Sequence, residues 1–305
     1  MDIDVDLNVR NDLDVPPEWE HIPFTELTGT LLIIGAPDTG KSTFARYLYR
    51  RLCRTNAHRQ VAFVDGDIGQ ASLGPPTTMT LALGEPGDDR FPPGSHVYRA
   101  FVGAVSPRRH MLPTVVAAHR LVWKAYMEGA TTVVFDTTGM INPKHGGGEL
   151  KRAKIELLRP TMIFALQRDS ELEHILFPLR HSRRFRVIEL PVSQAIQKRG
   201  ILTRQMYRAE RFRRYFHHAQ PIAVEWRRLA VFPAPAFSPH RLVALEDEAG
   251  LALGLAVVVE NDSLTGIVTL YTPLGVLDSQ EYMPNVDAIR LGDLTLDPGT
   301  YRVMV

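Results

Sequence analysis

Continuous apolar runs alternate with amphipathic segments along the chain up to about residue 218. Runs typical of buried strands lie at residues 31–34, 61–64, 132–135, 161–166 and 186–190. Helical patterns lie between several of them, at residues 44–52, 112–128 and 149–158. Because parallel strands are covered by helices on both faces, this alternation predicts a doubly wound, mostly parallel α/β sheet with its ligand at the carboxyl ends of the strands.

The pattern changes after about residue 219, where short apolar runs are separated by turn residues. These runs lie at residues 242–245, 253–259, 266–271, 288–291 and 301–305. Short strands at this spacing predict a small β-rich domain. The chain is therefore expected to contain an acidic, partly extended N-terminal segment at residues 1–28, an α/β domain at 29–218 and a β-rich domain at 219–305.

Composition excludes several other classes of protein. With 305 residues, 45% of them hydrophobic and 23% charged, the chain has ordinary globular composition. The single cysteine, Cys53, rules out an internal disulfide and a cysteine-rich metal site. No uninterrupted apolar run approaches the roughly eighteen residues that a membrane-spanning helix needs, and the N-terminus has no signal-peptide pattern. A cytoplasmic location without membrane contact is the expectation.

The most informative pattern follows the first apolar run. Residues 35–43 read Gly-Ala-Pro-Asp-Thr-Gly-Lys-Ser-Thr, the Gly-x-x-x-x-Gly-Lys-Ser/Thr pattern of a phosphate-binding loop (P-loop) between a strand and a helix. Its glycines let backbone N–H groups and the helix N-terminus point at a phosphate chain. The lysine of this pattern reaches the β- and γ-phosphates, and the hydroxyl binds Mg²⁺. The predicted nucleotide-binding residues are Gly35, Asp38, Thr39, Gly40, Lys41, Ser42 and Thr43.

Carboxylates follow two of the other predicted strands. Asp65 and Asp67 end the second apolar run, and Asp136 ends the third. Side chains at i and i+2 of an extended segment point the same way, so one of the first pair can serve a metal while the other takes a proton. A plain turn rich in aspartate and glycine is the alternative. Asp136 and Thr137 are expected near the γ-phosphate, whereas an N-cap is the alternative role for Thr138.

The net charge of +1 conceals an uneven distribution of charge along the chain. Between Arg180 and Arg228 the sequence carries thirteen arginines and lysines and only three acids. Such a block is usually a solvated surface, but next to a P-loop it can also contact a polyanion such as RNA or DNA.

Further motifs follow the P-loop in a fixed order. They are Asp-Gly-Asp-x-Gly-Gln at 65–70, Val-Gly-Ala-Val-Ser-Pro at 102–107 with His110, Asp-Thr-Thr-Gly at 136–139 and an arginine-rich segment at 207–216. Together they resemble the polynucleotide 5′-hydroxyl kinases, the family that includes the kinase subunit of pre-mRNA cleavage complexes and ribosomal-RNA-processing kinases. The resemblance implies a P-loop NTPase fold with an arginine-rich lid. It also implies Mg²⁺-dependent transfer of the γ-phosphate of ATP or GTP to the 5′-hydroxyl of single-stranded or end-exposed RNA or DNA.

The resemblance also implies roles for particular residues. Lys41 and Ser42 would hold the phosphates and Mg²⁺, and Asp67 would act as the general base on the 5′-hydroxyl. Arg204 and Arg208, at i and i+4 of a helix, would close over the triphosphate. The implied catalytic residues are Lys41, Asp67, Arg204 and Arg208, the implied metal ligands are Ser42, Asp65, Asp67 and Asp136, and the implied substrate-binding residues are Gln70, Ser106, Thr138, Gly139, Met140 and Arg211.

Met140 departs from the pattern of the family. Eukaryotic members commonly carry at this position a tryptophan that stacks on a substrate base, and such stacking is worth about 1–3 kcal/mol per base. Weaker or differently placed base contacts are therefore expected. Trp123 is not expected to replace that ring, because it lies in the middle of a predicted helix on a face predicted to be core.

Two other functions stay open on the sequence alone. The first is a nucleotide-bound scaffold of an RNA-processing complex that performs no transfer, although the implied catalytic set is present in full. The second is an NTPase for metal insertion or protein targeting, which no cluster of metal-ligating residues supports. The sequence leaves open ATP or GTP as donor, RNA or DNA as acceptor, the protein partners and the oligomeric state.

Overall fold

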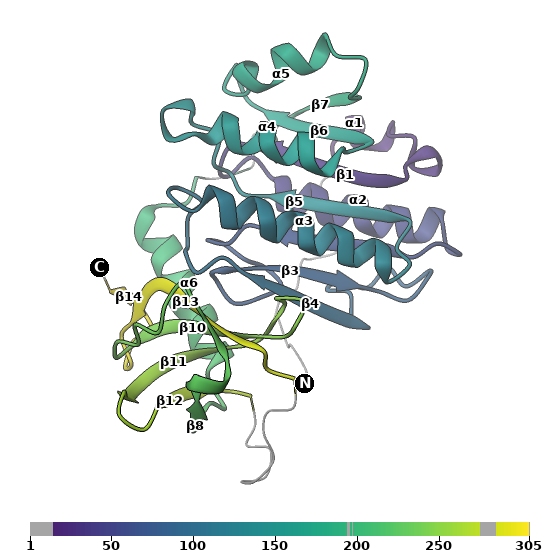
Figure 1. Cartoon of the computed structure of the whole chain (residues 1–305). Helices are drawn as coiled ribbons and strands as arrows, with labels where there is room; N and C mark the ends of the chain where they lie inside the picture. The colour runs from purple at the N-terminus through teal and green to yellow at the C-terminus, as the bar shows by residue number, and fades with distance from the viewer. Residues whose placement is uncertain (1–14, 194–195, 197, 275–284, 305) are drawn as a thin grey trace.

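The computed structural model describes residues 15–193, 196, 198–274 and 285–304, which form two seven-stranded sheets (Figure 1). The first sheet has the strand order β4-β3-β2-β5-β1-β6-β7. Strand β3 pairs antiparallel with both β2 and β4, and the other neighbouring strands pair parallel, so the predicted mostly parallel α/β sheet is confirmed. The strands are β1 (Gly29–Gly35), β2 (Val61–Gly66), β3 (Thr78–Leu83), β4 (His96–Phe101), β5 (Thr132–Thr137), β6 (Met162–Gln167) and β7 (Val187–Pro191).

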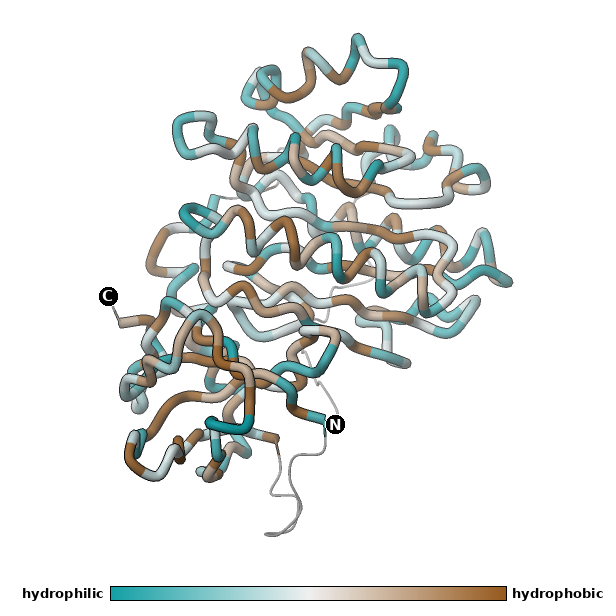
Figure 2. Tube along the Cα trace, in the orientation of Figure 1, coloured by the Kyte–Doolittle hydropathy of each residue, from teal (hydrophilic) through white to brown (hydrophobic). Residues whose placement is uncertain are grey.

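Helices cover both faces of this sheet because successive residues of its strands point to opposite sides. Leu32 and Ile34 of β1 belong to the core beneath three helices, whereas Leu31 and Ile33 belong to the core on the other face. In Figure 1, α3 and α4 lie in front of the sheet and α2 lies behind it, and hydrophobic stretches run along the strands between them (Figure 2). No helix of the described residues is long and apolar enough to cross a membrane. The helices are α2 (Lys41–Thr55), α3 (Met111–Met127), α4 (Gly147–Leu158) and α5 (Glu173–Arg180).

The N-terminal segment is more ordered than the sequence predicted. Residues 1–14 of the expected acidic segment lie outside the described residues, but residues 15–28 include a helical turn, α1 (Pro17–Glu20), and a 3₁₀ turn, η1 (Phe24–Glu26). Trp19 is buried, with its ring 4.9 Å from that of Phe44 and 5.3 Å from that of Tyr47, centroid to centroid. These aromatic contacts attach the segment to α2, which explains why it is not simply extended.

The second sheet confirms the predicted β-rich domain at the C-terminal end. Its order is β14-β13-β10-β11-β12-β8, and β9 pairs parallel with β13. The sequence did not predict β8, in which exposed and half-buried residues alternate without an apolar run, or the short β9. The elements are β8 (Gln220–Glu225), β9 (Ala230–Phe232), β10 (Arg241–Glu246), β11 (Ala252–Asp262), β12 (Ile267–Thr272), β13 (Ala288–Leu296) and β14 (Val303–Met304), with the 3₁₀ turn η3 (Trp226–Arg228). Another 3₁₀ turn, η2 (Pro143–His145), belongs to the first domain, between β5 and α4.

Helix α6 (Ile201–Tyr215), the predicted arginine-rich lid, joins the two sheets. Phe212 and the adjacent Phe216 are fully buried in one cluster with Phe101 of β4 and Leu242 of β10. The backbone N–H of Leu255 in β11 donates to the hydroxyl of Tyr215 at 2.7 Å. We propose that the domain boundary near residue 219 separates the two sheets but not this shared core.

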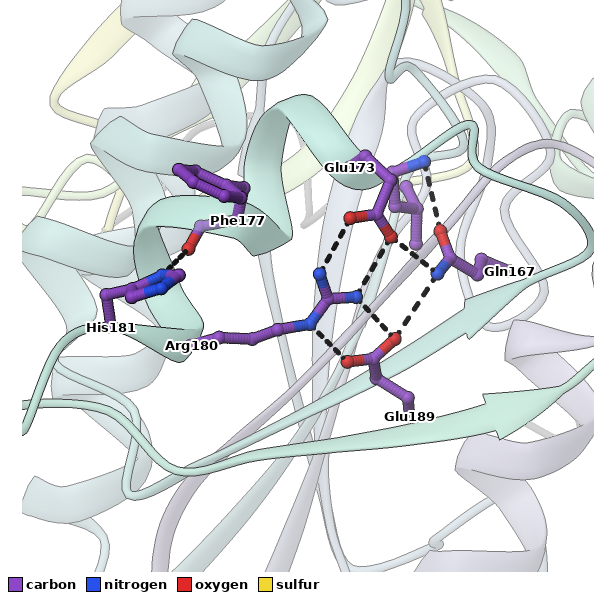
Figure 3. A network of polar contacts seen from close by, with 7 residues as sticks. Gln167, Glu173, Phe177, Arg180, His181 and Glu189 are labelled. Carbon is purple, nitrogen blue, oxygen red and sulfur yellow. Dashed lines mark hydrogen bonds and ion pairs between the residues drawn. The ribbon is translucent and has the colours of Figure 1, made fainter.

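Arg180 anchors α5 to the edge of the first sheet (Figure 3). Its guanidinium pairs with Glu173 of α5 and Glu189 of β7, each at 2.6 Å, and Gln167 of β6 donates to both carboxylates. The hydrogen bonds from Arg180 and Gln167 lower the pKa of Glu173 to about 2. One arginine of the basic block is thus committed to a structural network rather than to a solvent-facing patch.

Phe216→Ala is expected to lower the free energy of unfolding by about 3–5 kcal/mol, because it leaves a cavity in a packed core. The ring of Phe216 lies 5.9 Å from that of Tyr301 and 6.2 Å from that of Tyr271. Leu202→Ala is the matched control, since Leu202 lies on α6 but is 73% exposed. Urea denaturation followed by tryptophan fluorescence measures both, and equal stability of the two variants would contradict the shared core.

Candidate active site

A cavity of about 910 Å³ opens at the carboxyl ends of β1, β2 and β5. It is bordered by the P-loop, by α6 and by the turn after β5. Most of the predicted site residues line it, namely Asp38, Thr39, Gly40, Lys41, Ser42, Thr43, Asp67, Gln70, Ser106, Thr138, Gly139, Met140, Arg204 and Arg208. Gly35, Asp65, Asp136 and Arg211 do not line it directly.

The P-loop has the backbone shape that phosphate binding needs. Gly40 adopts a φ of 85°, and α2 begins at the next residue, so the helix N-terminus points into the cavity. A Cβ on Gly35 would lie 2.7 Å from the carbonyl oxygen of Leu166, so no larger residue fits there. Lys41 is 7% exposed and donates to the carbonyl oxygen of Ala36 at 2.6 Å. Burial lowers the pKa of Lys41, and the nearby carboxylates of Asp136 and Asp67 oppose that shift.

Asp65 and Asp67 differ in their surroundings, because Asp67 lines the cavity and Asp65 does not line it directly. Asp65 is buried, and its two oxygens accept hydrogen bonds from the backbone N–H groups of Asp67, Ser72 and Leu73 and from the Ser72 hydroxyl. Strand β2 ends at Gly66, so the strand periodicity does not extend to Asp67. Three of these bonds fall on Oδ2 and one on Oδ1, so Oδ1 is the oxygen of Asp65 that retains capacity for a further contact.

Asp67 presents its carboxylate to the cavity. Its Oδ1 accepts the backbone N–H groups of Gly69 and Gln70, each at 3.0 Å. The described residues place no donor on its Oδ2, and the side chain lines the cavity beside Lys41. One carboxylate oxygen is therefore held by the loop while the other is available to a ligand.

Asp136 lies beneath the P-loop at the end of β5. It is 1% exposed, and within the described chain its Oδ1 has no hydrogen-bond partner. Burial, followed by the charge of Asp65, raises the pKa of Asp136 to about 7, while Lys41 and a hydrogen bond with Ser42 oppose the rise. The described residues contain no cluster of three metal-ligating side chains. Ser42 with the unpartnered oxygen of Asp136 fits a Mg²⁺ ion that keeps most of its ligands from phosphate and water.

Helix α6 is docked over the cavity through its side chains. Arg204 pairs with Asp38 of the P-loop at 2.6 Å, and Tyr207 donates to the carbonyl oxygen of Ala71 at 2.9 Å. Arg208 lines the cavity, and its buried Nε has no partner among the described residues. Arg211 lies outside the cavity, because its guanidinium donates to the carbonyl oxygens of Ser72 and Gly74, at 3.0 Å and 2.8 Å. Both bonds are donated by Nη2, whereas its buried Nε has no partner among the described residues.

The turn after β5 forms another part of the cavity wall, next to the P-loop. A Cβ on Gly139 would lie 2.7 Å from the backbone nitrogen of Pro37, so this turn packs directly on the P-loop. The fully buried Lys151 of α4 donates to the Thr137 hydroxyl at 2.7 Å and to the carbonyl oxygen of Thr138 at 2.5 Å. These bonds hold the turn in place beneath Met140, which lines the cavity.

Several cavity residues were not predicted from the sequence. Arg46 lines the cavity one helical turn after Ser42, its buried Nε has no partner within the described residues, and its guanidinium lies 5.2 Å from the ring centroid of Phe91. The i, i+4 spacing from Ser42 was the available signal. Outside the cavity, the prediction that Trp123 lies on a core face of its helix was wrong, because its side chain is 56% exposed. The other unpredicted lining residues are Pro37, Gly69, Ser72, Val105, Pro107, Ile196, Lys198, Arg199, Gly200, Thr203 and Tyr207.

Comparison with known proteins agrees with this geometry. Residues 35–218 match the family model described as the P-loop of the mRNA cleavage and polyadenylation factor CLP1. The chain belongs to the CLP1 P-loop family. Its fold is also similar to that of Clp1p in a complex with Pcf11p, with a TM-score of 0.63, 14% identity, and coverage of 88% of this chain and 74% of that one.

Curated relatives of this CLP1-family chain come from archaea. A polyribonucleotide 5′-hydroxyl-kinase of Methanocaldococcus jannaschii is 30% identical over 218 residues, which are 72% of this chain and 58% of the relative. A polyribonucleotide 5′-hydroxyl-kinase of Pyrococcus furiosus is 32% identical over 225 residues, 72% of this chain and 60% of the relative. The match thus spans less than two thirds of the length of these relatives.

Asp136→Asn is expected to remove a pH-dependent loss of stability. The folded chain holds the Asp136 proton up to a pKa of about 7, whereas the ordinary value is 3.8. Between these values the unfolded chain has released that proton, so wild-type stability falls as pH rises, by up to about 1.4 kcal/mol per pH unit. Asparagine does not titrate, so the variant should gain stability relative to wild type as pH rises through this window.

Urea denaturation of both proteins without nucleotide or metal, at about pH 5 and about pH 7.5, measures this difference. A stability difference that is the same at both pH values would contradict the raised pKa of Asp136.

Proposed function

We propose that the chain is an NTP-dependent polynucleotide 5′-hydroxyl kinase. The observation that carries the proposal is the single cavity that holds Lys41, Asp67 and Arg208 together. A phosphate cradle, a free carboxylate oxygen and a cationic lid are the parts that phosphoryl transfer to a hydroxyl requires. The names of the archaeal relatives support the same reaction, although the match covers only part of each.

The P-loop side is the proposed donor site. Lys41 would leave the Ala36 carbonyl for the β- and γ-phosphates, and the N-terminal amides of α2 would hold the phosphate oxygens. Ser42 and Asp136 would hold Mg²⁺, which neutralises charge on the triphosphate when bound. Both ATP and GTP fit this description, because the contacts proposed for the P-loop are all to phosphate groups.

Asp67 is the proposed general base. Its Oδ1 is held by two loop amides, so its Oδ2 is oriented to take the proton of a 5′-hydroxyl as the oxygen attacks the γ-phosphorus. Arg204 and Arg208 would balance the negative charge of the transferring group. The products are a nucleoside diphosphate and a 5′-phosphorylated polynucleotide, and no covalent enzyme intermediate is needed.

The proposed acceptor is a single-stranded or end-exposed RNA or DNA with a 5′-hydroxyl. Gln70, Ser106 and the turn at residues 138–140 line the same cavity as the P-loop. Met140 supplies an apolar surface there in place of an aromatic ring. In this proposal Arg211 stabilises the loop after β2, because its guanidinium donates to two carbonyl oxygens of that loop.

The direct test incubates the purified protein with Mg²⁺, γ-labelled ATP or GTP, and 5′-hydroxyl RNA and DNA oligonucleotides. Label is expected on the 5′ end with wild type and not with Lys41→Ala, because that variant lacks the cation that reaches the phosphates. Tight nucleotide binding without transfer to any acceptor would reject the kinase and favour a nucleotide-bound scaffold.

Asp67→Asn is expected to lower kcat by about 10²–10⁴-fold while nucleotide affinity stays within about twofold. Asparagine keeps the shape and can still accept the two loop N–H bonds, but it cannot take the proton. Steady-state kinetics and equilibrium binding of a fluorescent nucleotide separate the two effects. Near-normal turnover of this variant would remove Asp67 from its proposed role.

A further inference from the structure

The segment at residues 103–110 connects the cavity with the C-terminal domain. Its middle residues, Val105, Ser106 and Pro107, line the cavity. The carbonyl oxygen of Val105 lies 2.5 Å from where a Cβ on Gly69 would stand, so the segment also packs on the loop that carries Asp67. The position of this segment therefore sets the shape of the proposed acceptor side.

The two ends of the segment are both held by β13 of the C-terminal domain. At the first end, the backbone N–H of Asp293 donates to the carbonyl oxygen of Gly103 at 2.9 Å. At the second end, Oδ2 of Asp293 lies 2.7 Å from Nε2 of His110, the residue that precedes α3. Asp293 of the second sheet thus hydrogen-bonds to both ends of the 103–110 segment, whose middle residues line the cavity.

Close backbone packing fixes the same contact. Gly103 adopts a φ of 76°, and a Cβ there would lie 2.8 Å from the Cα of Gly292. A Cβ on Gly292 would lie 3.1 Å from the carbonyl oxygen of Gly103. The two backbones meet with no room for a side chain, which leaves the segment little freedom to slide along β13.

Asp293 is itself oriented by a neighbouring strand. Arg241 of β10 donates from Nε to the carbonyl oxygen of Gly292 at 2.8 Å, and its Nη2 lies 3.8 Å from Oδ1 of Asp293. The carboxylate therefore has one oxygen toward Arg241 and the other toward His110. Its side chain is 65% exposed, so the contact is weak in energy and serves to orient rather than to stabilise the fold.

We infer that Asp293 and His110 are positioning residues for the polynucleotide acceptor, and that the C-terminal β domain is thereby part of the acceptor site. This inference rests on the proposed kinase function. Neither residue lines the cavity, so both act through the 103–110 segment. Loss of their contact lets that segment move, which weakens acceptor binding while leaving the P-loop and Asp67 intact.

The test is a double-mutant cycle of Asp293→Ala and His110→Ala, with Glu248→Ala as control because Glu248 is exposed in the same domain. Each single variant is expected to raise the acceptor KM about fivefold, with kcat and nucleotide KM within about twofold, since an exposed pair is worth up to about 1 kcal/mol. The double variant should be no worse than either single variant. An unchanged acceptor KM, or additive losses, would overturn the inference.

Hydrogen exchange of the chain without substrate gives a readout that does not depend on turnover. Asp293→Ala should speed amide exchange within residues 103–110 and leave the amides of the P-loop unchanged, whereas Glu248→Ala should change neither. Unchanged exchange in the segment would overturn the inference even if wild type is an active kinase. If wild type phosphorylates no acceptor, the proposed function fails on its own assay and the acceptor role falls with it.

Discussion

The cavity depends on one buried carboxylate, that of Asp65. Its four hydrogen bonds fold the loop after β2 back on itself, and that loop carries Asp67 into the cavity. Burial raises the pKa of Asp65, while the bonds from Leu73 and Ser72 oppose that shift. Tyr207 and Arg211 of α6 donate hydrogen bonds to backbone carbonyl oxygens of the same loop. The buried Asp65 side chain thus positions both Asp67, the proposed general base, and the loop on which α6 docks.

Charge balance inside the protein supports this arrangement. Asp65 of β2 and Asp136 of β5 are direct partners in the pairing of these two strands, so two buried carboxylates lie side by side in the sheet. Lys151 and Lys154 of α4 are fully buried on the other side of β5. Burial lowers the pKa of Lys154 to about 8, and the carboxylates of Asp67 and Asp136 oppose that shift. Buried charges are tolerated when opposite charges and hydrogen bonds compensate them. Here Lys154 is compensated by the charges of the two carboxylates rather than by hydrogen bonds, because its Nζ has no hydrogen-bond partner within the described residues.

The sequence predicted what depends on periodicity and local pattern, and failed where tertiary contacts decide. The parallel strands and the P-loop were predictable because each is a continuous run with its own signature. The orientation of Asp65 was not, because it depends on donors as far away as Leu73. The exposure of Trp123 was not, because it depends on which face of α3 packs on the sheet, and that face carries Ala118, Leu121, Val122 and Ala125.

The C-terminal sheet acts on the cavity by two different kinds of contact. The lid helix is anchored by Phe212 and Phe216, whose burial in a shared core is strong and insensitive to salt. The 103–110 segment is anchored instead by backbone packing on Gly292 and by the exposed contact between Asp293 and His110. Backbone packing fixes the first end of this segment, so the weak polar contact matters only at the second end, next to α3. The second sheet therefore holds α6 by apolar burial and the 103–110 segment by close backbone packing, and this difference follows from the residues at each contact.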